Sequence, residues 1–177
     1  MSRRTLMPGV ALLALALAAC AERDTPIAPD ALEPAYSAAA AEEGRILADI
    51  RRGTARYHRV EAAVADGYMP VSPCVAAPHG GMGYHYLKPS LANGTIDPAA
   101  PQMLLYEPRP NGKVELVGVE FVVPPALWQG SDTPRLGGQA FGMDPFGNHA
   151  LHVWVWRNNP VGMYADFNPR VSCAYAP

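Results

Sequence analysis

Residues 106–121 read YEPRPNGKVELVGVEF, and this stretch predicts an antiparallel β-hairpin. Its centre is the Asn-Gly pair at 111–112, which suits a type I′ turn because both central residues of that turn need positive φ. Valine alternates with charged and small residues on the second strand, which is typical of a strand with one buried face.

The turn also predicts the register of the hairpin. With a two-residue turn, the numbers of paired residues sum to 223, so Met103 lies opposite Glu120 and Glu107 lies opposite Leu116. Glu107 and Glu120 then share a face but lie roughly 13 Å apart along the strands, too far to bind one metal ion. Glu120 is deeper in the hairpin and is the better candidate.

The hairpin belongs to an expected α+β domain. A helical pattern runs from Ser37, a suitable N-cap, to Asp66, with Gly53 interrupting it and Gly67 ending it. After Pro70 the chain becomes rich in Pro, Gly and β-branched or aromatic residues, and the patterns predict strands near 83–87, 103–107, 114–123 and 150–157. We expect the N-terminal helical segment to pack on an antiparallel β-sheet or partial β-barrel, and the Gly/Pro-rich loop 124–147 to be a cover or poorly ordered.

Alternation along these strands separates two faces. The hydrophobic face of residues 114–123 is expected to carry Val117, Val119, Phe121 and Val123, with Leu116 opposite. On the other face, His85, Glu120 and His152 look into one space, lined by Trp154 and Trp156. One ionisable group among apolar residues on each strand is the composition of a pocket.

Two imidazoles and one carboxylate predict an open site for one divalent transition metal: Zn, Fe, Mn or Cu. His79, His149 and Glu107 are further candidate ligands, and Trp154, Trp156 and Tyr86 are candidate contacts for a small ligand. The same three central residues could instead perform general acid–base chemistry without a metal. They could also be ordinary residues of a solvated sheet face.

The N-terminal sequence predicts where in the cell the protein is located. Residues 1–20, MSRRTLMPGVALLALALAAC, combine a basic head, a short apolar run and a Leu-Ala-Ala-Cys ending. This ending resembles the lipobox of bacterial lipoproteins, in which the cysteine, here Cys20, carries the lipid. We expect an extracytoplasmic lipoprotein in the periplasm or outer membrane, held to a membrane at Cys20, with a flexible tether at 21–36 and a single globular domain at 37–177.

The other two cysteines, Cys74 and Cys173, are expected to pair, because an oxidising compartment favours a disulfide and no CxxC spacing suggests a metal or redox motif. The chain has 14 basic and 16 acidic residues, a formal net charge of −2, and no basic run. This balance argues against nucleic acid as a partner.

Several blocks resemble a family of secreted bacterial proteins and lipoproteins that is itself uncharacterised; they are GYMPVSPC, GGMGYHY, LLYEP, LVGVEFVVP and LHVWVWRNNPVGMYADFNPRVSC. The resemblance implies one domain starting in the helix and including Cys173, and it implies no activity or cofactor. The expected function is therefore a lipid-anchored domain that binds a metal ion or small ligand in a His/Glu/Trp pocket, with an oxidoreductase or hydrolase as the enzyme classes to test. The alternative is a metal-free envelope binding or structural lipoprotein whose polar face meets a partner or sugar.

Overall fold

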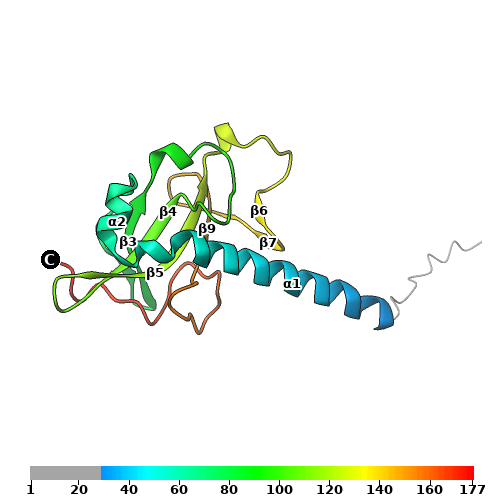
Figure 1. Ribbon diagram of the computed structural model, residues 1–177, viewed down its shortest axis with the longest axis horizontal. Coiled ribbons are helices and arrows are strands. Elements are labelled where there is room, and N and C mark those ends of the chain that lie inside the picture. Colours follow the sequence, from blue (N-terminus) through cyan, green and yellow to red (C-terminus); the bar gives the residue numbers. More distant parts are fainter. Residues whose placement is uncertain (1–28) are drawn as a thin grey trace, which may run out of the picture.

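A computed structural model describes residues 29–177, with side chains from residue 35 onward. The predicted signal peptide, the lipidation at Cys20 and the tether up to residue 28 lie outside the described residues. The fold is α+β, as predicted, with an N-terminal helix packed against an antiparallel sheet (Figure 1).

The helical region has three parts: α1 (Pro29–Thr54), the short 3₁₀ helix η1 (Ala55–His58) and α2 (Val60–Ala65). Helix α1 begins at Pro29 rather than Ser37, so residues 29–36 of the predicted tether are helical. The helix ends one residue after Gly53, where a Cβ would lie 2.0 Å from the carbonyl oxygen of Ala99. The N-terminal half of α1 extends beyond the sheet, with the side chains of residues 35–45 exposed (Figure 1). No described helix is long and apolar enough to cross a membrane.

The main sheet has seven strands in the order β1-β3-β4-β5-β9-β8, with β2 also pairing β3. All its pairings are antiparallel. Its strands are β1 (Met69–Pro70), β2 (Val75–Ala77), β3 (Gly80–Leu87), β4 (Met103–Pro108), β5 (Val114–Val123), β8 (Gly142–Met143) and β9 (His149–Val153). Two more 3₁₀ helices, η2 (Pro89–Leu91) and η3 (Pro125–Leu127), lie in connections, and the two-stranded sheet β6–β7 (Arg135–Leu136 and Gln139–Ala140) lies within the 124–147 loop.

The β4–β5 hairpin departs from the predicted type I′ turn. Arg109 and Lys113 close the turn through a 2.8 Å backbone hydrogen bond, and only Gly112, at φ +74°, has positive φ. The loop therefore has three residues ending in a left-handed glycine, the other common hairpin connection. Near the turn the paired numbers sum to 222, and Glu107 lies opposite Glu115 rather than Leu116.

A β-bulge then corrects this shift. The register changes between Leu105 and Tyr106, and beyond it Met103 lies opposite Glu120, as predicted. The additional residue on β5 reverses the predicted alternation: Leu116 joins the core beneath the helices, whereas Val117 lies on the opposite face of the sheet. One extra residue in the turn and one in the bulge thus cancel at Glu120.

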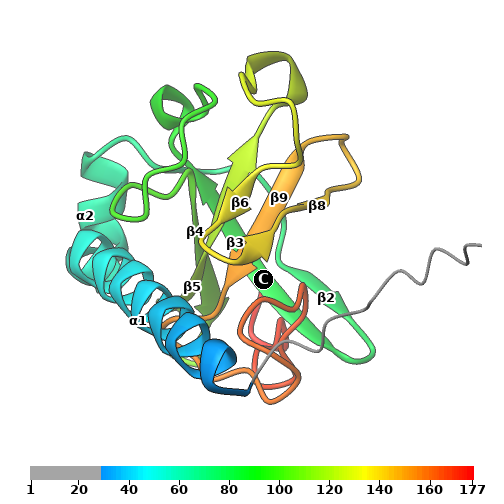
Figure 2. The same ribbon diagram turned by 90° about the vertical axis from the view of Figure 1, so that its right-hand side faces the viewer.

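The main core lies between the helices and one face of the sheet. Ile50, Tyr57 and Ala63 from the helical region pack there against strand residues, among them Leu104, Tyr106, Val119, Phe121, Leu151 and Val153. The hydroxyl of Tyr106 donates to the carbonyl of Tyr57 at 2.7 Å and ties η1 to β4. In Figure 2 the helices lie on one side of the sheet and the C-terminal segment on the other.

On the other face, a smaller cluster of Leu105, Val117, Trp154 and Val171 supports the sheet. The C-terminal segment is held there by the predicted disulfide between Cys74 and Cys173, which closes a loop with a sequence separation of 99. This second face carries the candidate functional residues.

Candidate metal centre

Three strands bring His85, Glu120 and His152 together. The pairing of β5 with β9 places Glu120 directly opposite His152, and β3 presents His85 from the far side of β4. The histidine ring centroids lie 6.0 Å apart, and one ligand atom from each of the three residues lies within 4.8 Å of the others. The sequence therefore predicted the central cluster correctly.

All three side chains are buried, with relative exposures of 8% for His85 and 5% for both Glu120 and His152. Both imidazoles direct Nε2 at the same carboxylate oxygen, Glu120 Oε2, at 3.6 Å from His85 and 3.9 Å from His152. These separations are longer than hydrogen bonds, and the Glu120 carboxylate accepts no hydrogen bond from the described part of the chain.

The surroundings of His152 leave one nitrogen unsatisfied. Across residues 35–177, only His152 Nε2 and Arg157 Nε are buried side-chain polar atoms without a hydrogen-bond partner. The other imidazole nitrogen, Nδ1, lies 3.7 Å from Asp166 Oδ1. A buried unpartnered nitrogen is costly, and it normally indicates that an ion or water binds there or that the residue has a functional role.

His85 Nδ1, the ring nitrogen that points away from Glu120, has a closer partner than His152 Nδ1 has. His85 Nδ1 lies 3.0 Å from Ser72 Oγ, which also accepts the backbone N–H of His85 at 3.2 Å. Ser72 and Asp166 were missed from the sequence because both lie in irregular segments, where strand alternation gives no signal. Each nevertheless contacts the histidine nitrogen that points away from Glu120.

The electrostatics follow from burial in one small space. Burial, together with the neighbouring His152, lowers the pKa of His85 to about 4. Burial raises the pKa of the Glu120 carboxyl, although His152 opposes this shift. Burial also disfavours protonation of His152, but the carboxylates of Glu120 and Asp166 outweigh it and raise its pKa. His85 is therefore a neutral imidazole near pH 7, as a metal ligand must be.

The remaining predicted ligands lie elsewhere. The ring of His79 packs against Phe167, with centroids 4.7 Å apart, and His149 pairs with Val123 at the start of β9. Glu107 shares the face of the site, as predicted, but its carboxylate is occupied by Arg109, Arg157 and the backbone N–H of Ser172. These three residues do not contribute ligand atoms to the cluster.

The predicted aromatic wall is only partly present. Trp154 stacks beside His152 at a centroid distance of 6.1 Å and donates its indole N–H to Ala165. Trp156 was predicted on the same face, but β9 ends at Val153 and alternation does not continue; its indole N–H donates to Thr54 Oγ1 on the helical side. Tyr86 also lies on the helical side, edge-on to Tyr106, and does not line the site.

Comparison of the chain with protein-family models, curated proteins and solved structures gave no match. Two imidazoles and one carboxylate, buried and facing a common point, could hold a metal ion.

Proposed function

We propose that the protein is a lipid-anchored extracytoplasmic protein that holds one divalent transition-metal ion between His85, Glu120 and His152. The observation that carries the proposal is the buried Nε2 of His152, which has no hydrogen-bond partner among the described residues and faces a carboxylate that accepts no hydrogen bond from them. An ion at their common focus would satisfy both groups at once. It would also neutralise the buried charge of Glu120.

The separations between ligand atoms support an ion rather than direct hydrogen bonds. Zinc–nitrogen and zinc–oxygen bonds of about 2.0–2.2 Å place tetrahedral ligand atoms roughly 3.3–3.5 Å apart. The two Nε2···Oε2 distances are 3.6 and 3.9 Å, a few tenths of an ångström wider. A metal-free hydrogen-bonded His–Glu pair would instead close to about 2.7–2.9 Å.

The donor set narrows the choice of metal. Two imidazoles and one carboxylate suit Zn²⁺ at open catalytic sites, and they suit Fe²⁺ in the facial arrangement of non-haem oxygenases. Mn and Cu also accept these ligands. We propose Zn or Fe first, because both have recurrent sites with this ligand set and at least one free coordination position.

Three protein ligands leave room for water or a small ligand. Trp154, which stacks beside His152, would form an apolar wall for it. A Lewis-acidic ion held by His85, Glu120 and His152 would supply an activated water, whereas a redox-active ion would supply redox chemistry. Hydrolase and oxidoreductase activity are therefore the two reaction classes to test.

Metal analysis tests the proposal. The full chain is purified from bacterial membranes in detergent without chelators. Elemental mass spectrometry should then find about one metal ion per chain. His152→Ala and Glu120→Ala should lose it. His79→Ala is the matched control, because this exposed histidine lies outside the cluster. A wild-type protein without metal that also takes up no Zn²⁺ or Fe²⁺ would contradict the metal site and favour a metal-free envelope binding protein.

The lipid anchor has its own test. Radiolabelled palmitate should enter the wild-type chain, and Cys20→Ser should abolish both the label and recovery with the membrane fraction. Cys20 is the last residue of the Leu-Ala-Ala-Cys sequence. Recovery of the wild-type chain in the soluble fraction, without label, would contradict the anchor and leave the metal proposal standing.

A further inference from the structure

A histidine can bind a metal ion only when its imidazole ring is in the correct tautomer. The nitrogen that binds the ion must carry a lone pair, so the other nitrogen must carry the proton, and a fixed acceptor beside it enforces this arrangement. The two histidines of the candidate centre have different neighbours at this outer nitrogen. The role inferred for these neighbours rests on the proposed metal site.

The neighbour of His85 is Ser72, whose Oγ contacts both the Nδ1 and the backbone N–H of the same residue. This double contact fixes the serine oxygen relative to the imidazole. A hydroxyl oxygen has two lone pairs, so Ser72 Oγ can accept the Nδ1 proton while it accepts the backbone N–H of His85. Accepting the Nδ1 proton as well would leave His85 Nε2 unprotonated and directed toward Glu120.

An irregular backbone brings Ser72 to this place. Pro70 pairs with Tyr86 in β1 and Val75 pairs with Gly83 in β2, so residues 71–74 face only residues 84–85 of β3. The extra length bulges away from the strand, although Val71 still donates its backbone N–H to the carbonyl of His85 at 2.9 Å. The bulge ends at Cys74.

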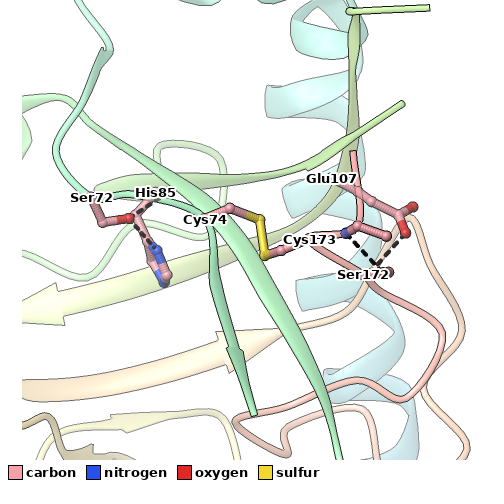
Figure 3. The surroundings of a disulfide bond; sticks show 7 residues. Ser72, Cys74, His85, Glu107, Ser172 and Cys173 are labelled. Carbon is pink, nitrogen blue, oxygen red and sulfur yellow. Dashed lines mark hydrogen bonds between the residues drawn. A yellow bond between two sulfur atoms is a disulfide. The ribbon is translucent and has the colours of Figure 1, made fainter. Parts of the chain in front are cut away.

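The disulfide holds the other end of the bulge. Cys74, two residues after Ser72, is bonded to Cys173 of the C-terminal segment. The backbone N–H of Ser172 in turn donates to the buried Glu107 carboxylate at 3.0 Å. Figure 3 shows the disulfide between the Ser72–His85 pair and the Glu107–Ser172 contact. The segment that carries Ser72 is therefore fixed by strand pairing before it and by a covalent bond after it.

The neighbour of His152 is held less tightly. Asp166 is 77% exposed at its side chain and lies 3.7 Å from His152 Nδ1, beyond hydrogen-bond length. Trp154 and the β5–β9 pairing already constrain this ring. We therefore expect the two outer contacts to differ in importance.

We propose that Ser72, held by the Cys74–Cys173 disulfide, is the positioning residue that fixes the metal-binding tautomer of His85. Ser72 does not contact His85 Nε2, the nitrogen proposed to bind the metal ion. It acts through the other ring nitrogen, Nδ1. The disulfide thereby makes metal affinity dependent on an oxidised chain.

Zinc affinity of the full chain, measured by competition with a chromophoric chelator, tests this role. Ser72→Ala should weaken zinc binding about 10- to 100-fold, the usual effect of losing an outer partner of a metal-bound histidine. Ser72→Thr, which keeps the hydroxyl, should recover most of the affinity. Asp166→Asn is the matched control at the other histidine and should change affinity less than Ser72→Ala.

The tautomer itself provides a second measurement. In metal-free protein with ¹⁵N-labelled histidine, nuclear magnetic resonance should show the His85 proton on Nδ1 in the wild type and a mixture of tautomers in Ser72→Ala. A purely structural serine would leave this signature unchanged. This readout needs no metal and remains informative if zinc affinity is affected by small changes in folding.

The disulfide is tested by a double-mutant cycle. Cys74→Ser/Cys173→Ser should weaken zinc binding, and Ser72→Ala should add little in that background. Full additivity would overturn the dependence of Ser72 on the disulfide. If the wild type binds zinc and Ser72→Ala has the same zinc affinity and the same His85 tautomer, the role of Ser72 is overturned and the metal site stands. If the wild type binds no metal, the proposed function is overturned.

Discussion

The β4–β5 hairpin carries two buried glutamates whose surroundings are opposite. Glu107 and Glu120 share one face of the sheet and have the same relative exposure, 5%. Glu107 accepts hydrogen bonds from Arg109, Arg157 and the backbone of Ser172. Glu120 accepts none from the described residues, and its neighbours are two histidine nitrogens at 3.6 and 3.9 Å.

This difference separates a carboxylate that serves the fold from one that serves a ligand. A buried charge needs a cation or several donors, because transfer from water is otherwise costly. The described residues supply both to Glu107 and supply only imidazoles to Glu120. The charge of Glu120 must therefore be neutralised by a cation from outside the chain or by a proton on Glu120 or His152.

The largest expected effect is on stability at Glu107. Glu107→Gln should lower the free energy of unfolding by about 3 kcal/mol, because an amide cannot neutralise the half-buried Arg157 and turns a donor toward it. Glu120→Gln, measured without metal, should cost little or even stabilise. Urea denaturation in the presence of a chelator gives both values. Equal losses in the two variants would remove the distinction.

The stability of the metal-free protein should depend on pH through His85, which lies beside Glu120. The pKa of His85 is about 4 in the folded chain against 6.5 when unfolded, so between these values the unfolded chain binds more protons. Stability without metal should therefore fall as pH drops through 6.5 and level off below about 4. The contribution is roughly 3 kcal/mol at most. Subtracting the pH profile of His85→Gln isolates it, and parallel profiles would contradict the prediction.

Metal affinity should reverse the ranking of the two glutamates. Glu120→Gln should weaken zinc binding about a hundredfold, equivalent to about 2.7 kcal/mol, because the charged ligand is lost. Glu107→Gln should leave the zinc affinity of its folded fraction unchanged. Calorimetric titration with zinc at a temperature where both variants are folded makes the comparison. A similar loss in both would place Glu107 in the site.

The smallest effect should come from the turn that ends the hairpin. Gly112→Ala should cost about 1 kcal/mol, because φ is +74° there although no atom lies within 4 Å of the added Cβ. Zinc affinity should stay constant, since the bulge at Val117 lies between the turn and Glu120. A change in affinity would show that the turn influences the register at Glu120.

The register also shows how far the sequence predicts this site. The alternation of β3, β5 and β9 was enough to place His85, Glu120 and His152 on one face. The predicted turn was one residue too short, but the unpredicted bulge restored the pairing of Met103 with Glu120. Between these two irregularities the prediction failed, and Leu116 and Val117 lie on faces opposite to those expected.

Irregular backbone explains the other differences. Trp156 follows the last residue of β9, where Val155 donates its backbone N–H to the carbonyl of Val153, and its side chain turns to the helices. Ser72 and Asp166 reach the histidines from segments without periodicity. Their positions depend on a bulge, a disulfide and loop packing, none of which is encoded in a local residue pattern.

The disulfide determines which parts of the molecule stay covalently joined after a cut in the chain. His85, Glu120 and His152 all lie between Cys74 and Cys173, inside the closed loop. A protease that cuts once in the exposed stretch at 129–133 separates His85 and Glu120 from His152 in sequence, yet the two pieces stay joined. The nicked protein would migrate as one chain until reduced, and its strand pairing could keep the three residues together.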